Sequence, residues 1–419
     1  MTDQCREITA CRICGSKHLD CVLSLGRQAL TGVFRRPEEP EPIYAPLDLV
    51  LCQDCKFLQL GHTIDPDMMY AEYWYRSGTN QTMIDHLAGV VADVRARVEL
   101  APGDVCIDIG CNDGTLLNAY EGTGVARIGA DPSDAITAIT DPSIAKVNTY
   151  FTAANVAGAL AGRKAKAITS ISMFYDLDRP SDFVRDIAAT LDADGVWVVE
   201  MNYTGTMVSS CGYDMISHEH VAYYTLRSFE RLIASHGLKV LDATFNPING
   251  GSIRLFAGFN GTPSAAVEEV RARELADGLE DAATYKAFAG RIESFKGKLV
   301  RLLNDIHARG EKVALYGAST RGNTILQHCG ITAELTFAAA DRNPAKWGLQ
   351  TSGSKIPICS EEDVRAIKPA YMFVLPYYFL PEFLRRERPY LDQGGKFIVP
   401  LPDLRIISVQ NGALQEQLV

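Results

Sequence analysis

The stretch from residue 105 to residue 117 constrains the fold more than any other part of this 419-residue chain. It opens with Val-Cys-Ile-Asp-Ile, a run too short for a helix, which indicates a buried parallel strand. Glycines follow at positions 110 and 114, where a tight turn from strand to helix would expose bare backbone to a ligand. A second expected strand, 126–130, ends on Asp131, close to the spacing at which a carboxylate meets ribose hydroxyls. The pattern predicts a nucleotide-type ligand at this turn.

Two ligands fit such a turn, NAD and S-adenosylmethionine. NAD sites favour three glycines, the second of which admits the pyrophosphate. Asn112 stands at that second position, and the acidic Asp113 would repel a pyrophosphate. A sulfonium cation without phosphates suits the loop better. The run Asp-Ile-Gly-Cys-Asn-Asp-Gly is similar to motif I of the methyltransferases that use S-adenosylmethionine.

Composition and charge narrow the class of protein. The formal net charge of -10 argues against binding nucleic acid by electrostatics. No apolar run approaches the roughly 18 residues of a membrane span, and the polar N-terminus has no signal-peptide core. The eleven cysteines are an odd number, and four of them form two C-x-x-C pairs. These features favour a cytoplasmic protein that binds metal over one held together by disulfides.

The two C-x-x-C pairs lie within the first 70 residues. Each pair can form a knuckle, and together they supply four thiolates for tetrahedral zinc. A redox-active pair is the alternative, although two paired knuckles favour zinc. Four protein ligands leave no open position, so the sequence predicts a structural Zn²⁺ bound by Cys11, Cys14, Cys52 and Cys55.

Strands and helices are expected to alternate from about residue 102 to residue 258, which predicts a doubly wound α/β domain. The expected strands are 104–109, 126–130, 167–172, 195–200, 238–245 and 252–258. The expected helices are 83–98, 114–121, 181–191 and 226–236. Ligands in such sheets bind outside the carboxyl ends of the strands. Tyr175 and Asn202 follow two of these strands and should therefore face the same crevice as Gly110.

The run Ser-His-Glu-His at 217–220 precedes a helix expected to begin near Thr225. Its histidines are two apart and would point to different faces of a helix, so zinc ligation is not expected. Titratable groups in a loop that faces a cofactor crevice indicate proton transfer instead.

Asn249 opens a tight Asn-Gly-Gly turn. Arg254 follows this turn, and its planar guanidinium could bind a phosphate; a plain hairpin with a surface arginine is the alternative.

A second α/β unit is expected after the helix-rich region 265–309. It begins with a strand and the turn Tyr-Gly-Ala-Ser-Thr-Arg-Gly-Asn at 316–323, and Asp341 closes the next strand, expected over 335–340. The turn lacks a P-loop and the full three-glycine fingerprint, which leaves an anion at the helix N-terminus as the plausible ligand. Aromatic residues around Tyr377 follow the strand 370–375 and could stack on a base.

The Tyr-rich stretch 70–80, near the N-terminal region, could form either a hydrophobic link between domains or contacts with the substrate.

The order of these motifs along nearly the whole chain resembles the S-adenosylmethionine-dependent sugar C-methyltransferases, which act on nucleotide-linked 4-keto deoxysugars. The resemblance implies an N-terminal zinc-binding part (1–70), a Rossmann-like class I methyltransferase domain (71–260) and a second Rossmann-like α/β domain (261–419), with the sugar nucleotide between the last two. It also implies methylation at C3 beside a C4 ketone of a dTDP- or GDP-linked sugar, with His220 of the Glu-His pair as the base and Glu219 as its competitor.

The candidate residues follow from the motifs and the resemblance together. For the reaction they are His220, Glu219 and Tyr75, the last as a donor to the enolate oxygen. For the cofactor they are Asp108, Gly110, Cys111, Asn112, Asp131 and Ser77. For the substrate they are Tyr175, Asn202, Tyr223, Asn249, Arg254, Arg321, Asn323 and Tyr377.

The chain departs from some members of that family at four places. Ser217 stands where some relatives have tyrosine, and Tyr175 and Asn249 stand where some have histidine. A frequent Trp-Asn is replaced by Pro376 and Tyr377. These differences leave the expected base in place and the sugar's stereochemistry and nucleotide open. The rival hypotheses are a binding module without catalysis, an O-methyltransferase and an NAD-dependent dehydrogenase.

Overall fold

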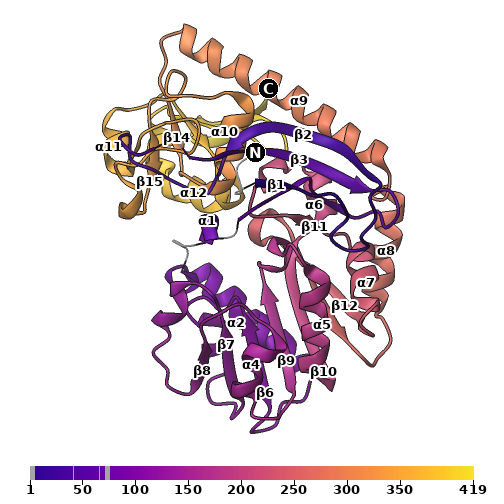
Figure 1. Ribbon diagram of the computed structural model, residues 1–419. Helices are drawn as coiled ribbons and strands as arrows, with labels where there is room; N and C mark the ends of the chain where they lie inside the picture. The colour runs from indigo at the N-terminus through magenta and orange to yellow at the C-terminus, as the bar shows by residue number, and fades with distance from the viewer. Residues whose placement is uncertain (1–4, 41, 66, 71–75) are drawn as a thin grey trace.

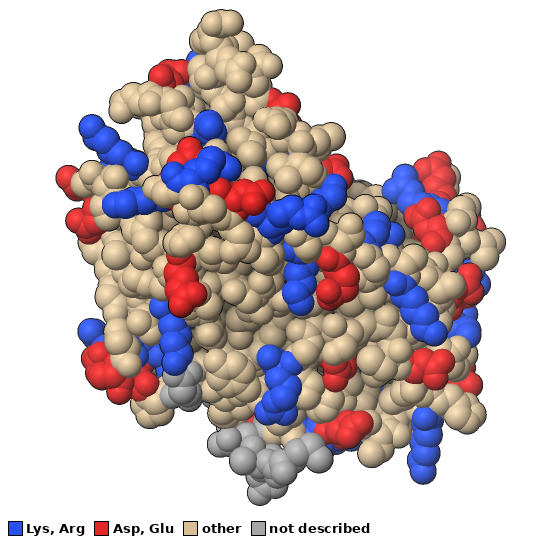
Figure 2. Space-filling model, turned by 90° about the horizontal axis from the view of Figure 1, so that it is seen from above, with Lys and Arg blue, Asp and Glu red and all other residues tan. Residues whose placement is uncertain are grey.

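The fold, in a computed structural model that describes residues 5–40, 42–65, 67–70 and 76–419, contains two seven-stranded sheets, a four-stranded sheet and a two-stranded sheet among these residues. Figure 1 shows the central sheet in the lower half, the C-terminal sheet at the upper left and the long helix α9 along the upper right. None of the described helices combines the length and the apolarity needed to cross a lipid bilayer. On the face in Figure 2, basic and acidic side chains are interspersed.

The N-terminal region forms the two small sheets. Strand β1 (Cys5–Glu7) pairs antiparallel with β5 (His62–Ile64). The four-stranded sheet has the order β11-β4-β3-β2, with β2 (Leu19–Ala29), β3 (Tyr44–Cys52) and β4 (Leu58–Leu60). Its edge strand β11 (Ala222–Tyr223) comes from the middle of the chain and begins two residues after His220. The expected division at residues 70 and 260 stays a prediction, and this sheet joins residues from both sides of the first boundary.

The central sheet has the strand order β12-β13-β10-β9-β6-β7-β8, in which β13 is antiparallel to both of its neighbours. The six expected strands correspond to β6, β7, β9, β10, β12 and β13. Strand β8 and helix α4 were not expected. The bounds are β6 Val105–Ile109, β7 Ala126–Ala130, β8 Ile144–Val147, β9 Ala165–Ile171, β10 Leu191–Asn202, β12 Lys239–Asn246 and β13 Ser252–Gly258.

Helices pack on the central sheet where their sequences place apolar residues on one face. Their bounds are α2 Gln81–Arg97, α3 Thr115–Asn118, α4 Ala153–Leu160, α5 Pro180–Thr190, α6 Thr204–Ser209 and α7 Leu226–Ala234. Helix α7 begins after Thr225, near the expected position, and Thr225 and Ser228 form a capping box there. The cap of α2 is Asn80, whose side chain accepts from the Thr82 N–H at 2.9 Å. Residues 77–79 form a separate 3₁₀ turn, η1.

Two helices, α8 (Ala265–Ala276) and α9 (Ala282–Ala308), lead to the C-terminal sheet. The buried side chains of α9 recur every three or four residues along its 27 residues, so one stripe of the helix faces the core. Strand β2 packs against α9 and α10. The helix α9 therefore braces the N-terminal and C-terminal regions together.

The C-terminal sheet has the order β16-β15-β14-β17-β18-β19-β20, with its first five strands parallel. The strand expected over 335–340 is shorter: β15 begins at Ala339, because turn hydrogen bonds from Leu335 and Thr336 to the Thr332 carbonyl occupy the preceding backbone. The strands are β14 Val313–Tyr316, β15 Ala339–Asp341, β16 Ile358–Ser360, β17 Tyr371–Val374, β18 Lys396–Val399, β19 Arg405–Gln410 and β20 Ala413–Leu418. The helices are α10 Thr320–Cys329, α11 Glu361–Ala366, α12 Leu380–Arg386 and α13 Arg388–Asp392.

Candidate active site and zinc site

The four predicted zinc ligands come together. The Sγ atoms of Cys11, Cys14, Cys52 and Cys55 all lie within 4.8 Å of one another. Two of the Sγ–Sγ distances are 3.5 and 3.6 Å. Four thiolates at about 2.3 Å from a tetrahedral Zn²⁺ would be about 3.8 Å apart, so the donor set fits zinc.

The backbone around these cysteines has the same geometry in both knuckles. The Gly15 N–H donates to the Cys11 carbonyl and the Lys56 N–H to the Cys52 carbonyl, each at 2.9 Å. Both donors have positive φ, 72° for Gly15 and 61° for Lys56. A hydrogen bond from Cys55 lowers the pKa of the Cys11 thiol. The cluster is a closed structural zinc site.

The glycine turn at the carboxyl end of β6 forms the candidate cofactor site. Gly110 has φ of 71°, and its N–H donates to the Ala130 carbonyl at 2.8 Å. A Cβ on Gly110 would lie 3.1 Å from the Met173 side chain, which leaves little room for any residue other than glycine at this turn. The Asn112 N–H donates to Asp131 Oδ2 at 2.8 Å, which ties the loop to the end of β7. Cys111 is buried, with its Sγ directed at Gly129.

Segment η1 lies directly against this loop. The Ser77 N–H donates to Asn112 Oδ1 at 3.1 Å, and the Gly78 N–H donates to Asp113 Oδ2 at 2.8 Å. Below the loop, burial raises the pKa of Asp108 to about 7, and its carboxyl accepts from Thr169 Oγ1 at 2.6 Å. The predicted cofactor residues are therefore contiguous. Tyr75, the predicted enolate donor, lies outside the described residues.

The His-Glu-His loop is held between the N-terminal sheet and the 3₁₀ turn η4 (Tyr213–Met215). His218 Nε2 donates to the Ala45 carbonyl at 3.1 Å, and burial lowers its pKa to about 4. His220 Nδ1 donates to the Met215 carbonyl at 2.9 Å, so Nε2 carries the lone pair of the neutral ring. Burial lowers the pKa of His220 to about 4, and the charge of Arg321 adds to this effect. His220 is therefore uncharged at neutral pH.

A small cavity borders His220. It has a volume of about 10 Å³, room for about one water molecule. The ring of Tyr175, from the turn after β9, lies edge-on to the His220 ring at 4.3 Å between centroids. The buried Oδ1 of Asn202, at the end of β10, has no hydrogen-bond partner among the described residues. The lining residues are Tyr175, Asn202, Tyr203, Thr204, Met207, Met215, His220, Ala222 and Tyr223.

Glu219 points away from this cavity, toward the N-terminal region. A Cβ on Gly32 would overlap Glu219 Oε1, so glycine leaves space for the carboxyl there. Burial raises the pKa of Glu219 to about 7. Gly32 carries no sequence pattern that would have marked it as a neighbour of the loop.

Arg254, predicted to bind phosphate, already has its guanidinium engaged. Its Nε donates to Glu200 Oε2 at 2.7 Å, and it also pairs with Asp93. His86 Nε2 lies 2.6 Å from the other oxygen of Glu200, whose side chain is fully buried. Sequence reasoning missed His86, since a lone histidine on a helix gives no signal of its partner. The structure places Arg254 in a buried network that joins α2 to the sheet.

Three other predicted substrate residues also contact protein groups. Arg321 forms an ion pair with the buried Asp214 at 2.7 Å and donates to the Asn249 carbonyl. Tyr377 OH donates to Asp214 Oδ1 at 3.0 Å. Asn323 is fully buried, and its Nδ2 donates to the Thr31 carbonyl at 2.7 Å. Asp214 was missed, although a lone acid within the apolar run 211–216 could have suggested a buried ion pair. The roles assigned to all these residues stay predictions.

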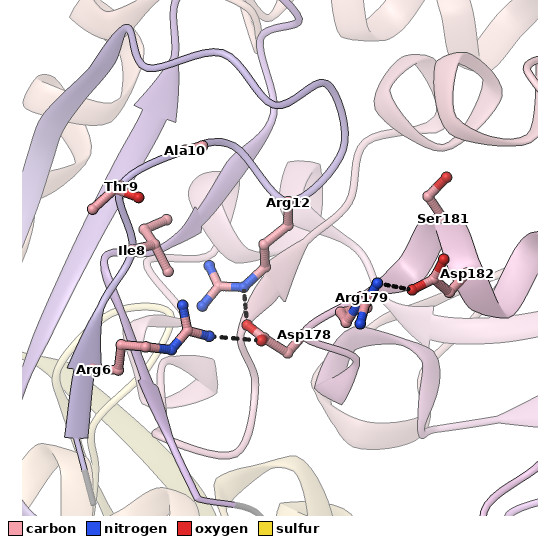
Figure 3. Close-up of a pocket in the computed structure, with 9 residues that line it drawn as sticks. All are labelled: Arg6, Ile8, Thr9, Ala10, Arg12, Asp178, Arg179, Ser181 and Asp182. Carbon is pink, nitrogen blue, oxygen red and sulfur yellow. Dashed lines mark hydrogen bonds and ion pairs between the residues drawn. The ribbon is translucent and has the colours of Figure 1, made fainter. Parts of the chain in front are cut away.

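A groove of about 330 Å³ separates β1 and the first zinc knuckle from the start of α5. Figure 3 shows Arg6 and Arg12 converging on Asp178, while Arg179 pairs with Asp182. Arg12 is almost completely buried and also donates to the Leu60 carbonyl. The groove thus marks an ionic contact between the zinc-binding region and the central sheet.

The strand order, the glycine turn and the acid at the end of β7 define a class I methyltransferase that uses S-adenosylmethionine. Sequence profiles agree: residues 83–243 match a methyltransferase domain, residues 11–70 a zinc-binding domain and residues 247–402 the C-methyltransferase C-terminal domain. The C-methyltransferase NovU of Streptomyces niveus is 32% identical over 98% of this chain and 100% of its own length. The chain belongs to this family of C-methyltransferases with an N-terminal zinc-binding domain.

Solved structures show weaker similarity. A complex of the Haloferax volcanii Trm112 methyltransferase activator matches with 16% identity over 44% of this chain and 95% of that one, at a TM-score of 0.35. Magnesium protoporphyrin IX methyltransferase of Synechocystis, with bound SAH, matches with 14% identity over 42% of this chain and 87% of that one, at a TM-score of 0.34.

Proposed function

We propose that this C-methyltransferase methylates C3 of a nucleotide-linked 4-keto deoxysugar, in the biosynthesis of unusual sugars. The observation that carries the proposal is a neutral His220 with Nε2 as its basic atom, beside a cavity lined by Tyr175 and Asn202. A C–H bond next to a ketone is acidic enough for such a base to remove its proton. The motif order along the chain supports the sugar nucleotide as the substrate.

His220 acts as the base in this proposal. The C3 proton moves to Nε2 while the C3–H electron pair forms the enolate, whose oxygen is the former C4 carbonyl. Tyr75 donates a hydrogen bond to that oxygen. S-adenosylmethionine supplies the methyl group as a sulfonium, and the new C3–CH₃ bond forms as the S–CH₃ bond breaks. Met215 holds Nδ1–H throughout, so the ring keeps one orientation.

Glu219 is the alternative base. Its pKa of about 7 matches neutral pH better than that of His220, and general-base efficiency favours such a match. Its carboxyl, however, lies against Gly32, whereas the His220 ring borders the cavity at the carboxyl ends of β9 and β10. Position therefore favours His220.

The sugar needs more room than the cavity offers in this conformation, so neighbouring side chains must move when it binds. The buried Asn202 Oδ1 is available to accept a sugar hydroxyl. For the nucleotide we favour thymidine diphosphate over guanosine diphosphate. The proposal places the sugar nucleotide between the central and C-terminal sheets.

The experiment incubates the zinc-loaded protein with methyl-labelled S-adenosylmethionine and 4-keto deoxysugars linked to dTDP or GDP. We expect label in an acid- and base-stable product whose NMR spectrum shows the new methyl on C3. Label on oxygen, or no transfer to either substrate, would contradict the proposal.

Exchange of the C3 proton with deuterated solvent isolates the first step. His220→Asn should slow exchange by about 100- to 10,000-fold, the usual contribution of a general base. Glu219→Gln should retain most of the exchange. The reverse pattern would assign the proton transfer to Glu219.

A further inference from the structure

The first turn of α10 reaches across from the C-terminal sheet to the candidate active site. Arg321 places its Nε 2.8 Å and its NH2 2.7 Å from Asp214 Oδ2, and both side chains are largely shielded from solvent. The arginine also lies over the Tyr378 ring, 4.9 Å from its centroid. Tyr377 OH donates to the other oxygen of Asp214. Every part of the ion pair is thus fixed by protein groups, and the carboxylate is bound on both oxygens.

Asp214 lies one residue before Met215, whose carbonyl accepts the hydrogen bond from His220 Nδ1. On the other side of Met215, the Ile216 carbonyl accepts from Thr324 Oγ1 at 3.0 Å. Helix α10 therefore contacts the residues on both sides of Met215, through the Asp214 side chain and the Ile216 carbonyl. A shift of this backbone would change the direction of the carbonyl that sets the tautomer of His220.

We propose that Asp214 and Arg321 are positioning residues that hold the Met215 carbonyl in place and thereby keep His220 in the Nδ1–H tautomer, with Nε2 basic. The inference rests on the proposed role of His220 as the base. It replaces phosphate binding by Arg321 with an indirect role, because the guanidinium is occupied by Asp214 and the Asn249 carbonyl. It also gives the C-terminal region a part in the proton-transfer step.

The titratable groups around His220 come from five places. Tyr175 lies in the turn after β9, Tyr203 follows β10, Tyr223 lies in β11, Glu219 is the neighbour of His220 in the loop, and Arg321 lies in α10. Burial raises the pKa of Tyr223, so this side chain stays neutral over the pH range of interest. Glu219 titrates near pH 7, and its effect can be removed with Glu219→Gln.

Nitrogen-15 NMR of the zinc-loaded, histidine-labelled protein tests the tautomer without any sugar. The chain has eight histidines, and His220→Asn identifies the signal of interest. We expect the Nδ1–H tautomer in the wild type, with a titration midpoint near pH 4. In Arg321→Gln, loss of the nearby positive charge should raise the midpoint, and the tautomers should mix. The titration is repeated in the Glu219→Gln background.

Two further variants keep the test valid if Arg321→Gln folds poorly. Asp214→Asn combined with Arg321→Gln leaves no unpaired charge, and Arg321→Lys keeps the charge but loses the planar fork. Arg365→Gln is the matched control, because it breaks a different ion pair of the C-terminal region, with the buried Glu387. The control should leave the His220 signals unchanged. Arg321→Lys should keep the low midpoint but mix the tautomers.

Kinetics supply the second readout. In the double variant we expect turnover to fall by about 100-fold, the order expected for a misplaced catalytic group. Affinity for S-adenosylmethionine and KM for the sugar nucleotide should change less than about threefold. A wild-type tautomer and midpoint in both Arg321 variants and in the double variant would overturn the inference. The wild-type NMR result combined with no sugar methylation would overturn only the proposed function.

Discussion

The chain contains two strand–glycine–helix turns whose backbones are fixed in the same way. The Gly110 N–H donates to the Ala130 carbonyl, and the Gly317 N–H donates to the Ala340 carbonyl, both at 2.8 Å. Asp131 accepts from the Asn112 N–H at 2.8 Å, and Asp341 accepts from the Ala318 N–H at 2.9 Å. Each acid also accepts an N–H two residues further along the chain at 2.8 Å. The two turns are therefore held by the same kinds of local hydrogen bonds.

The helices that follow these turns differ. Helix α3 has four residues, and the turn before it is the candidate cofactor site. Helix α10 has ten residues and uses its polar side chains to bind other parts of the chain. Gln327 exchanges two hydrogen bonds with the backbone of Ala29, and Asn323 binds the Thr31 carbonyl. The turn at Gly317 is thus followed by a helix whose side chains bind other parts of the chain, whereas the turn at Gly110 is the candidate ligand site.

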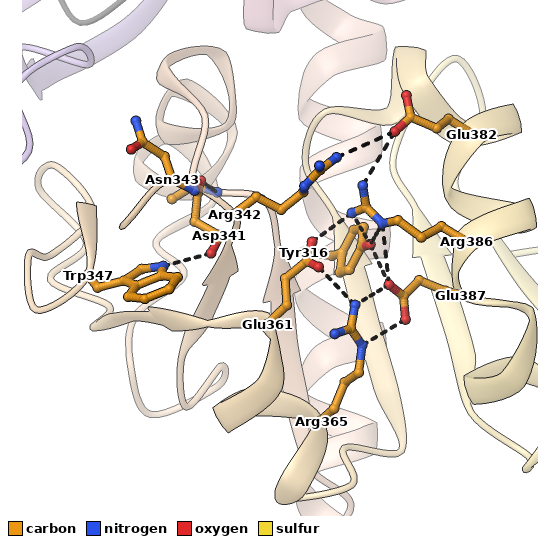
Figure 4. A network of polar contacts seen from close by, with 11 residues as sticks. Tyr316, Asp341, Arg342, Asn343, Trp347, Glu361, Arg365, Glu382, Arg386 and Glu387 are labelled. Atoms are coloured by element: carbon orange, nitrogen blue, oxygen red, sulfur yellow. Dashed lines mark hydrogen bonds and ion pairs between the residues drawn. The ribbon is translucent and has the colours of Figure 1, made fainter. Parts of the chain in front are cut away.

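The surroundings of the two acids differ as well. Asp131 is buried beside the cofactor loop. Asp341 lies at the edge of an ionic network, shown in Figure 4, in which Arg365 and Arg386 contact Glu361 and Glu387. Trp347 donates from Nε1 to the Asp341 carbonyl at 2.8 Å. The second turn is thus embedded in protein contacts.

Removal of zinc should have the largest effect, because the His220 loop continues into β11, which completes the N-terminal sheet. Cys52→Ser should abolish zinc binding and reduce turnover at least about 1,000-fold, since the knuckle beside β4 loses its metal. The cofactor turn does not contact the zinc, so affinity for S-adenosylmethionine should persist. Elemental analysis, calorimetry and turnover measure the three effects. A metal-free variant with full turnover would contradict the structural role.

Paired substitution of the two acids tests the difference in ligand binding. Asp131→Ala removes hydrogen bonds that shape the cofactor turn, so affinity for S-adenosylmethionine should fall by about 10- to 100-fold. Asp341→Ala removes the two corresponding backbone hydrogen bonds from the second turn, together with an ion pair to Lys346, and serves as the control. Its cofactor affinity, measured by calorimetry, should equal that of the wild type. Equal losses in both variants would mean that the turns share the ligand.

The strands before the two turns differ in one buried side chain. When Gly110 is aligned with Gly317, the carboxyl of Asp108 in the first strand corresponds to the apolar Leu315 in the second. The pKa of Asp108 is raised to about 7, so the folded state retains its proton where the unfolded state has lost it. The free energy of unfolding should therefore fall by about 2–4 kcal/mol from pH 4 to pH 7. Asp108→Asn should lack this part of the decline in urea titrations. An identical slope in both proteins would show that Asp108 is not the cause.

The smallest expected effect concerns the two serine caps. Ser319 Oγ accepts from the Gly322 N–H at 3.0 Å at the start of α10, and Ser319→Ala should lower the free energy of unfolding by about 1 kcal/mol. Ser133 Oγ donates to Asp131 at 2.6 Å, so Ser133→Ala should also weaken cofactor binding by a few-fold. Denaturation measured with and without S-adenosylmethionine separates the effect on stability from the effect on cofactor binding. A loss of cofactor affinity in Ser319→Ala would contradict the comparison.

Local patterns were enough to predict much of the fold. The turn at Gly110, the two cysteine knuckles and six strands of the central sheet each depend on residues near one another in the sequence. Tyr175 and Asn202 come to one cavity because the carboxyl ends of the parallel strands β9 and β10 meet at one edge, and His220 and Tyr223 reach the same cavity from the loop before β11 and from β11 itself.

Long-range partners could not be predicted in the same way. Arg254 follows a glycine turn and is suited to phosphate, yet Glu200 lies opposite it across the β10–β13 ladder. Arg321 also suited an anion, but its partner Asp214 comes from 107 residues earlier. A side chain's charge shows which partners it can take, while only the tertiary packing determines which one it meets.

The late arrival of β11 has a consequence for folding. Strands β2, β3 and β4 are complete by residue 60, but the edge strand that pairs with β4 begins only at residue 222. On the ribosome, the sheet beside the zinc knuckles therefore exists with an unpaired edge while some 160 further residues are made. An unpaired edge is a site for aggregation, and contacts so distant in sequence form slowly. The same short strand that follows the His-Glu-His loop thus closes the exposed edge of a nascent chain.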